Sequence, residues 1–348
     1  MNKILIFNIA TDSDDTSLGF AVSWLNSLSK SYDVVDVVTL KKGNTSLLNR
    51  NINVFEIKKN NVSIIRIFKA VNLIKKLLVK DKYSYCLSHM SPILSIISYF
   101  QLKRKNIPSV LWYAHPGPKD IRKKIILYIS KFTVDKIITS TSNSYPLKSK
   151  KINAIGQAIN YDYFFIEKKE YDNENFLILS RISKSKKIDE SINAFLNSIY
   201  SKSNSIYVIG GPVTVSDKKY YLFLKNKYKN FDNVIFKGSI PHNQLKKYFQ
   251  DTKFHINNTT KGNYDKTVLE TSLSGIINFY KNSDYDKFFP NKYINYLRFE
   301  NNTDDLLNKI SMINELNDAE LSKIIKSSQI EIQKETLETL DQRIKSIL

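Results

Sequence analysis

The 348-residue sequence has little cysteine, histidine or glycine, and each shortage excludes a class of site. The single cysteine, Cys86, allows no internal disulfide and no cysteine-based zinc site. None of the nine glycines forms the G-x-G-x-x-G motif of a dinucleotide site or a phosphate-binding P-loop. The four histidines lack the H-E-x-x-H spacing of a zinc hydrolase. We therefore expect no cofactor and no metal.

Long apolar runs are also absent from the sequence. No stretch approaches the roughly 18 apolar residues of a membrane span, and residues 92–100 come nearest. The apolar residues 4–7 are too few for the central region of a signal peptide. Together with the single cysteine, this predicts a cytoplasmic protein without a spanning helix.

The whole chain has a net charge of +20, and acidic residues are scarce in its first half. Residues 1–160 hold 25 Lys and Arg against 9 Asp and Glu, whereas residues 161–348 hold 28 against 24. Codon bias towards Lys, Asn and Ile is one explanation, although it does not account for the missing acids. The other is an anionic partner: a membrane surface, a nucleic acid or an anionic glycan.

Two basic segments bear on that choice. Residues 64–80 and 120–133 are predicted to be basic amphipathic helices, suited to the surface of an anionic bilayer, so the protein could be peripheral on the inner membrane face. The alternative is that both helices pack on a sheet and keep their lysines in water. We expect no nucleic-acid partner, because no known module matches and basic residues are not interleaved with aromatic ones.

Short apolar segments alternate with helical ones along the whole chain, which is typical of a parallel, doubly wound sheet. The pattern runs from residue 3 to about 140, is interrupted by a charged run at 167–174, and then restarts. The predicted fold class is α/β with two Rossmann-like domains facing across a cleft. The expected parts are residues 1–160, residues 161–325, and a C-terminal helix at 326–348 that packs back on the first domain.

Four segments of the second half place phosphate-binding residue types just after predicted strands, where open α/β sheets bind ligands. Arg181 and Lys186 are positioned to converge on a diphosphate, with a solvated basic loop as the alternative. Gly210 allows close approach of a ligand, and the turn at Ile240 could hold a nucleobase edge. Residues 261–275 form a loop that enters a helix, whose N-terminus suits phosphate.

Glu270 lies one turn inside that helix, where its carboxylate could accept hydrogen bonds from ribose hydroxyls. The alternative is an exposed helix residue.

The four segments resemble motifs of the family 4 retaining glycosyltransferases, which have the GT-B fold. Residues 180–195 are similar to G-R-L-x-x-x-K-G-x-x-x-x-I-x-A-F, and residues 207–212 to I-x-G-x-G-P. Residues 233–240 resemble N-V-x-F-x-G, and the end of 261–275 resembles L-E-A-x-A-x-G. The order and intervals fit across residues 176–280. In the first half the resemblance is fainter, in a loop leading to Gly19 and in the Trp-Tyr-Ala-His-Pro run that contains His115.

The resemblance implies a retaining, metal-independent hexosyltransferase that moves a sugar from a nucleotide-diphosphate sugar, a UDP- or GDP-sugar above all, to a glycan or lipid-linked acceptor. It implies a catalytic role for Arg181 and Lys186 at the pyrophosphate, and contact of His115 with the transferred sugar; a structural histidine is the alternative for His115. It places the other donor-binding residues at Gly19, Gly210, Ile240, Asp265, Thr267, Val268, Leu269 and Glu270. Such enzymes assemble envelope glycans and polysaccharides.

The sequence departs from that family at several positions. Gly262 stands where the family has a glutamate that contacts the donor sugar, so Asp265 or Asn263 could substitute for it. Lys187 stands where the family has a glycine. The loop at 12–15 carries three aspartates, which we assign to acceptor hydroxyls or to no ligand. Its D-x-D pattern recurs at 284–286, but a hard cation needs several oxygen ligands at once.

Two other functions remain open from the sequence. One is a nucleotide-sugar epimerase or another non-transferase with the same fold, which would consume donor without an acceptor. The other is a non-catalytic anion-binding protein that uses its charge alone.

Overall fold

The computed structural model describes residues 2–15, 18–58, 63–115, 117–118, 120–167, 171, 173–300 and 302–348. The chain divides into two compact units. Unit 1 comprises Met1–Ala158 together with Leu337–Leu348, and unit 2 comprises Ile159–Thr336. Within the described residues, no helix is both long and apolar enough to cross a bilayer.

Unit 1 is built on a seven-stranded parallel sheet with the order β3-β2-β1-β4-β5-β6-β7. Its central strands are almost continuously apolar, as expected for a parallel sheet covered on both faces. The strands are β1 Lys3–Thr11, β2 Val34–Lys42, β3 Ile52–Glu56, β4 Cys86–His89, β5 Ser109–Trp112, β6 Lys136–Thr139 and β7 Ile152–Ala154.

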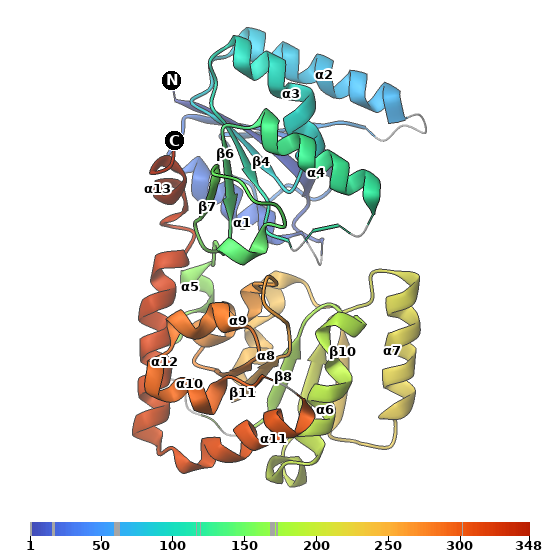
Figure 1. The fold of residues 1–348 in the computed structure, drawn as a ribbon, viewed down its shortest axis with the longest axis vertical. Helices are drawn as coiled ribbons and strands as arrows, with labels where there is room; N and C mark the ends of the chain where they lie inside the picture. Colours follow the sequence, from blue (N-terminus) through green and yellow to red (C-terminus); the bar gives the residue numbers. More distant parts are fainter. Residues whose placement is uncertain are drawn as a thin grey trace. The chain divides into compact units, whose positions relative to one another are not determined.

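Helices cover both faces of this sheet, and alternate residues of β1 show which helix meets which face. Ile4 and Ile6 pack in one core with α1 (Phe20–Ser29) and α13 (Leu340–Lys345), whereas Leu5 and Phe7 pack with helices of the opposite face. The helices of that opposite face lie side by side in Figure 1 and are α2 Ser63–Lys80, α3 Pro92–Arg104 and α4 Ile121–Thr133.

The segment 337–348 is fixed to unit 1 by polar and apolar contacts. The hydroxyl of Ser27 donates to the carbonyl of Leu337 over 2.8 Å, and the hydroxyl of Tyr32 donates to Asp341 over 2.8 Å. Leu340 and Ile344 of α13 are fully buried in the same core as α1. This segment therefore completes one face of unit 1.

Unit 2 has a five-stranded parallel sheet with the order β10-β9-β8-β11-β12, enclosed in a single core. The strands are β8 Phe176–Leu179, β9 Ile206–Ile209, β10 Val234–Gly238, β11 Phe254–Asn257 and β12 Ile277–Tyr280. The helices are α5 Tyr161–Phe164, α6 Ile188–Leu196, α7 Val215–Lys227, α8 Lys246–Gln250, α9 Lys266–Leu273, α10 Asn291–Leu297, α11 Thr303–Met312 and α12 Asp318–Ile332.

Two parallel α/β sheets confirm the predicted fold class. Most expected elements appear within a few residues of their predicted bounds, but β7 is not predicted, because it is only three residues long. Of the predicted C-terminal part, residues 326–336 lie in unit 2 and residues 337–348 in unit 1.

Candidate functional site

The four predicted segments of unit 2 all follow strands at the carboxyl edge of its sheet. Arg181 comes two residues after β8, Gly210 directly after β9, and Ile240 two residues after β10. Helix α9 follows β11 through the loop at 258–265. Because the strands are parallel and adjacent, their carboxyl ends lie along the same edge, where ligands bind in open α/β sheets.

Gly210 is required by the packing of this edge itself. Its φ of +146° belongs to glycine, and a Cβ there would lie 1.8 Å from the carbonyl oxygen of Ser180. Its N–H donates to the carbonyl of Gly238 over 2.8 Å, which joins the ends of β9 and β10. The sequence predicts a glycine here for close approach of a ligand, whereas in the structure the Ser180 carbonyl already leaves no room for a Cβ.

Lys186 and Asp265 form an ion pair at the centre of the edge. The Lys186 ammonium lies 2.6 Å from Asp265 Oδ2, and the Asn257 amide donates to the same oxygen over 3.2 Å. The Lys186 side chain is mostly buried, at 13% exposure. The structure thus brings together two of the predicted donor-binding residues and neutralises one with the other.

Arg181 is exposed, and no described residue forms a hydrogen bond or ion pair with its guanidinium. Desolvation raises the pKa of Asp217, but the net shift is downward, chiefly because of hydrogen bonds with the backbone and side chain of Thr214. The positive charge of Arg181 lowers this pKa further, by a smaller amount. Arg181 is therefore a cation at this edge that is available to an anionic ligand.

Helix α9 begins without a side-chain cap, although Asp265 occupies the capping position. The Asp265 carboxylate bonds to Lys186 instead, so the backbone N–H groups of Thr267, Val268 and Leu269 have no side-chain acceptor in the part of the chain that the structure describes. The hydroxyl of Thr267 is buried without a hydrogen-bond partner among the described residues. An uncapped N-terminus of this kind attracts anions through its free N–H groups and its dipole.

Lys266 adds a second cation to the start of α9. Burial lowers the pKa of its ammonium to about 8, and the attraction of Glu270 opposes that effect. An ammonium with this pKa keeps most of its charge at pH 7.

Glu270 is buried, with 3% exposure, which overturns the alternative of an exposed helix residue. Its Oε1 lies 2.8 Å from Nε2 of His242, whose ring packs edge-on against Phe164. The carboxylate is therefore held in a fixed orientation by one partner, and its second oxygen receives no hydrogen bond from the described residues.

Lys187 and Gly262 explain two departures from the family motifs. Lys187 has φ +50° and ψ +40°, the left-handed conformation in which a glycine would be unstrained, and its ammonium pairs with Glu190 at 3.1 Å. Gly262 has φ +89°, so a glutamate at that position would strain the backbone. The family's glutamate is therefore incompatible with this loop as it is folded.

The three aspartates of the loop at 12–15 hold that loop together. Asp12 accepts from the backbone N–H groups of Asp14 and Asn44, and Lys41 lies 3.2 Å from Asp12 and 3.0 Å from Asp15. Gly19, at the start of α1, donates its N–H to the carbonyl of Asp15 over 2.8 Å. These contacts favour the interpretation in which the aspartates bind no ligand. Across the described part of the chain, no group of three or more His, Cys, Asp and Glu could hold a metal.

His115 lies in unit 1, exposed, three residues after the end of β5. A second histidine of unit 1, His89, lies in a buried aromatic cluster, where its ring contacts Trp24 and Trp112 edge-on. Its Nδ1 lies 3.0 Å from Asn8 Oδ1. His89 is therefore a structural histidine of the core, whereas His115 has the exposure that contact with a ligand requires.

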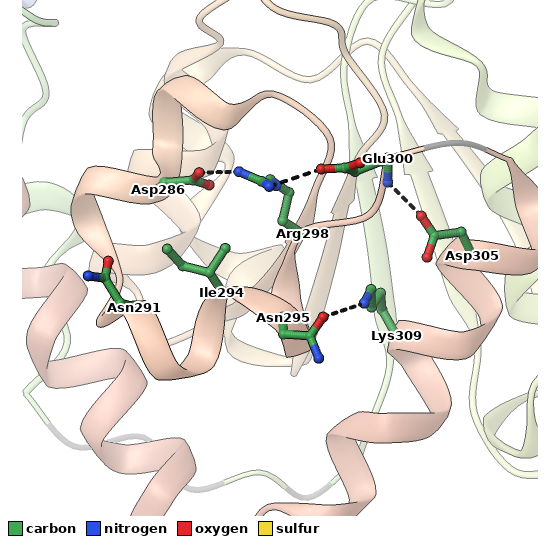
Figure 2. A pocket seen from close by; sticks show the side chains of 8 residues that line it. All are labelled: Asp286, Asn291, Ile294, Asn295, Arg298, Glu300, Asp305 and Lys309. Atoms are coloured by element: carbon green, nitrogen blue, oxygen red, sulfur yellow. Dashed lines mark hydrogen bonds and ion pairs between the residues drawn. The ribbon is translucent and has the colours of Figure 1, made fainter.

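A separate hollow of about 640 Å³ in unit 2 contains none of the predicted residues (Figure 2). In Figure 2 the Arg298 guanidinium lies between Asp286 and Glu300, and Lys309 donates to Asn295 over 3.0 Å. The charges of Arg298, Asp286 and Glu300 are thus paired with one another, and Asp305 accepts from the backbone N–H of Glu300. The lining consists of Asp286, Asn291, Ile294, Asn295, Arg298, Glu300, Asp305 and Lys309.

Solved structures resemble the chain over its whole length. Sucrose-phosphate synthase from Thermosynechococcus elongatus has a TM-score of 0.76 at 13% identity, covering 100% of this chain and 98% of its own. Anabaena HepE in complex with UDP and glucose has a TM-score of 0.72 at 14% identity, covering 99% of each chain. The chain has the GT-B fold. The lipopolysaccharide outer core galactosyltransferase WaaB, with a TM-score of 0.69 at 13% identity, covers 99% of this chain and 100% of its own.

No protein-family model matches this GT-B chain, and no curated protein matches it in sequence. The likeness to solved structures therefore shows the fold, and the function depends on the residues of the site.

Two residues of that site were not predicted from the sequence. No sequence pattern singles out His242, because it follows a strand in an irregular segment and meets Glu270 only through the fold. Lys266 is visible in the sequence as a cation at the start of a helix, but nothing in the sequence indicates that desolvation lowers the pKa of its ammonium.

Proposed function

We propose that this chain is a retaining glycosyltransferase that moves a sugar from a nucleotide-diphosphate sugar to a hydroxyl acceptor. The observation that carries the proposal is the concentration of cations and free N–H groups at one sheet edge. Arg181 and Lys186 follow β8, Lys266 is the first residue of the uncapped helix α9, and the buried Glu270 follows one turn later. A diphosphate with a ribose beside it matches this arrangement of charges.

The arrangement suits departure of a nucleoside diphosphate. When the bond between the sugar and the diphosphate breaks, the leaving oxygen takes the electron pair and gains negative charge. Preorganised donors aimed at such charge each contribute roughly 2.7–4 kcal/mol in comparable oxyanion sites. Arg181, Lys186 and the N–H groups of Thr267, Val268 and Leu269 are the groups we assign to this role, with no metal required.

The remaining assignments of the site follow the family resemblance. Glu270 accepts hydrogen bonds from the ribose, and Gly210 and Ile240 line the base and phosphate region. Asp265 or Asn263 contacts the donor sugar in place of the glutamate that Gly262 excludes. In unit 1, His115 contacts the transferred sugar and Gly19 lies in the loop beside it.

The donor and acceptor classes are supported by the structural neighbours. HepE has been solved with UDP and with UDP-glucose, and TarM with UDP and alpha-GlcNAc-glycerol. WaaB is a lipopolysaccharide galactosyltransferase. We propose a hexosyl donor carried by UDP or GDP, and an acceptor belonging to an envelope glycan or a lipid-linked precursor of one.

The test is a titration of the protein with UDP, GDP, ADP, CMP, dTDP and inorganic pyrophosphate, by calorimetry and thermal shift. One nucleoside diphosphate should bind and raise the melting temperature by mass action. Arg181→Ala should weaken that nucleotide and pyrophosphate alike, by roughly tenfold for the loss of one charge-assisted contact. Glu270→Gln should weaken the nucleotide but leave pyrophosphate unchanged.

Lys229→Ala is the matched control, because Lys229 is an exposed cation that precedes β10, at the opposite edge of the sheet. Equal losses in Lys229→Ala and Arg181→Ala would refute the site. Release of nucleoside diphosphate from the matching sugar donor should then depend on added glycan acceptor. Equal release without any acceptor would contradict a transferase and favour an epimerase or hydrolase of the same fold.

A further inference from the structure

Helix α4 of unit 1 carries its apolar stripe on the side that faces away from the sheet. Five apolar residues recur at the three- and four-residue spacing that places side chains on one helix face. All five are exposed, from 42% to 66%, and they are Ile121, Ile125, Tyr128, Ile129 and Phe132. The residues of α4 that are buried are Leu127 and Ser130, on the opposite face. The sheet therefore does not account for the stripe.

Cations lie beside the stripe. At 100° per residue, Arg122 falls on one border of the apolar face, and Lys124 and Lys131 fall on the other. The Lys131 ammonium lies 5.0 Å from the ring centre of Tyr128 and 4.8 Å from that of Phe132. An exposed apolar face bordered by Lys and Arg is typical of a helix that lies in the plane of a membrane surface.

The neighbouring helices extend this surface. Helices α2, α3 and α4 pack side by side on the same face of the sheet, as Figure 1 shows. Phe68 in the first turns of α2 is 63% exposed and Phe100 of α3 is 76% exposed. The sequences of the three helices hold eleven Lys and Arg and no Asp or Glu. The surface thus exposes large apolar side chains among cations, and its formal charges are uniformly positive.

The structure also decides how α2 uses its apolar residues. Ile74 and Leu78, in its second half, are buried against the sheet, whereas Ile64 and Phe68 at its start are exposed. Packing on the sheet with lysines in water therefore describes only the second half of α2 and does not describe α4.

We propose that α2, α3 and α4 form the face by which this protein docks on a bilayer of anionic lipids, with the apolar stripe of α4 inserted at the level of the headgroups. Charge complementarity selects this occupant, since three adjacent helices without an acid match a negatively charged leaflet. Burial of the apolar side chains among the lipids and attraction of the cations to anionic headgroups both contribute to the free energy of binding. The proposal stands independently of the proposed function, because vesicle binding requires neither donor nor transfer.

The experiment is flotation of the full-length protein with vesicles of phosphatidylglycerol and phosphatidylcholine, compared with vesicles of phosphatidylcholine alone. The protein should float with the anionic vesicles and much less with the neutral ones, and added salt should weaken the binding. The double variant Ile125→Ser/Phe132→Ser should bind at least roughly tenfold more weakly, since two inserted side chains are removed. Both positions are exposed, so the fold should be unaffected.

The matched control is Leu222→Ser/Phe223→Ser on α7 of unit 2, where both side chains are exposed to a similar degree. This control should bind vesicles like the unmodified protein. An equal loss in the control, or binding that ignores the lipid charge, would overturn the assignment. The assignment also fails if the protein stays off vesicles while forming a dimer in sedimentation velocity that Ile125→Ser/Phe132→Ser dissociates.

A second measurement reports insertion directly. Because Cys86 is buried and is the only cysteine, Ile125→Cys introduces a single reactive thiol for an environment-sensitive fluorophore. Its emission should shift to the blue on anionic vesicles, while the same label at Leu222→Cys should not shift. Equal shifts at the two positions, or none at Ile125→Cys, would contradict insertion of α4.

Discussion

The ammonium of Lys186 and the carboxylate of Asp265 lie 2.6 Å apart at the carboxyl edge of the unit 2 sheet. The cation that we assign to the donor diphosphate is therefore already paired with a carboxylate of the chain itself. An arriving diphosphate would exchange one anionic partner of Lys186 for another, while Asp265 remains close enough to oppose it.

This relationship predicts that Asp265→Asn tightens binding of the nucleoside diphosphate. Removing one negative charge near the diphosphate should strengthen binding by roughly fivefold, as for a partly screened charge pair at a protein surface. Transfer from the complete donor should slow, because Asp265 is one of the two residues that we assign to the donor sugar. Calorimetry with UDP and a turnover assay measure the two effects separately.

The control for this prediction is Asp232→Asn, which removes an exposed carboxylate just before β10, at the opposite edge. It should change neither quantity. Weaker UDP binding by Asp265→Asn would show that the carboxylate serves the diphosphate site in some other way.

Lys266 predicts a pH dependence of nucleotide binding. Its pKa of about 8 means that the ammonium loses its proton as the pH rises through 8, well below the usual range of roughly 10.4 for lysine. Affinity for the nucleoside diphosphate should therefore fall between pH 7 and pH 9, by roughly three- to tenfold for one lost charge. Lys266→Arg keeps its charge throughout this range, so its affinity should stay level. A slope that persists unchanged in Lys266→Arg would assign the titration to another group.

Gly210 and Gly238 form a matched pair that separates a steric requirement from a conformational one. Both have positive φ, but a Cβ at Gly210 would meet the Ser180 carbonyl at 1.8 Å, whereas a Cβ at Gly238 would meet nothing within 4 Å. Gly210→Ala should destabilise unit 2 severely, by roughly 3 kcal/mol or more. Gly238→Ala should cost only about 1 kcal/mol of backbone strain. Urea unfolding measures both, and equal costs would show that the edge relaxes around the added methyl group.

The backbone conformation of Lys187 predicts that glycine suits this position better than alanine. Its left-handed backbone conformation is strained for any residue with a Cβ, and about 1 kcal/mol separates alanine from glycine in that conformation. Lys187→Gly should therefore be more stable than Lys187→Ala by about that amount, with the ion pair to Glu190 lost in both. The free energies of unfolding of the two variants test this. An alanine variant as stable as the glycine variant would show that the loop adopts another conformation.

The sequence was informative wherever local pattern decides structure. Apolar segments of strand length predicted the parallel sheets, and the interval between Arg181 and Glu270 placed both at the same edge. Strand β7 is not predicted, because three residues are too few to show the alternation of a strand. Contacts that depend on tertiary folding, such as the bond from His242 to Glu270 over 28 positions, could not be predicted from the sequence.

Helix α4 shows a second limit of sequence patterns. Its spacing correctly predicts an amphipathic helix, but periodicity does not say which face meets the sheet. A small buried surface of Leu127 and Ser130 holds the helix, and the larger apolar face is left outside. Only the arrangement of α4 on β5 and β6 decides this.

The return of residues 337–348 to unit 1 affects how the protein can be made and divided. These residues are synthesised after all of unit 2, yet Leu340 and Ile344 fill part of the core under α1. During translation, the apolar face of unit 1 that Leu340 and Ile344 cover therefore stays exposed until unit 2 has been synthesised. A fragment ending at residue 158 would expose that face permanently and aggregate, whereas the same fragment joined to 337–348 through a linker should remain dispersed.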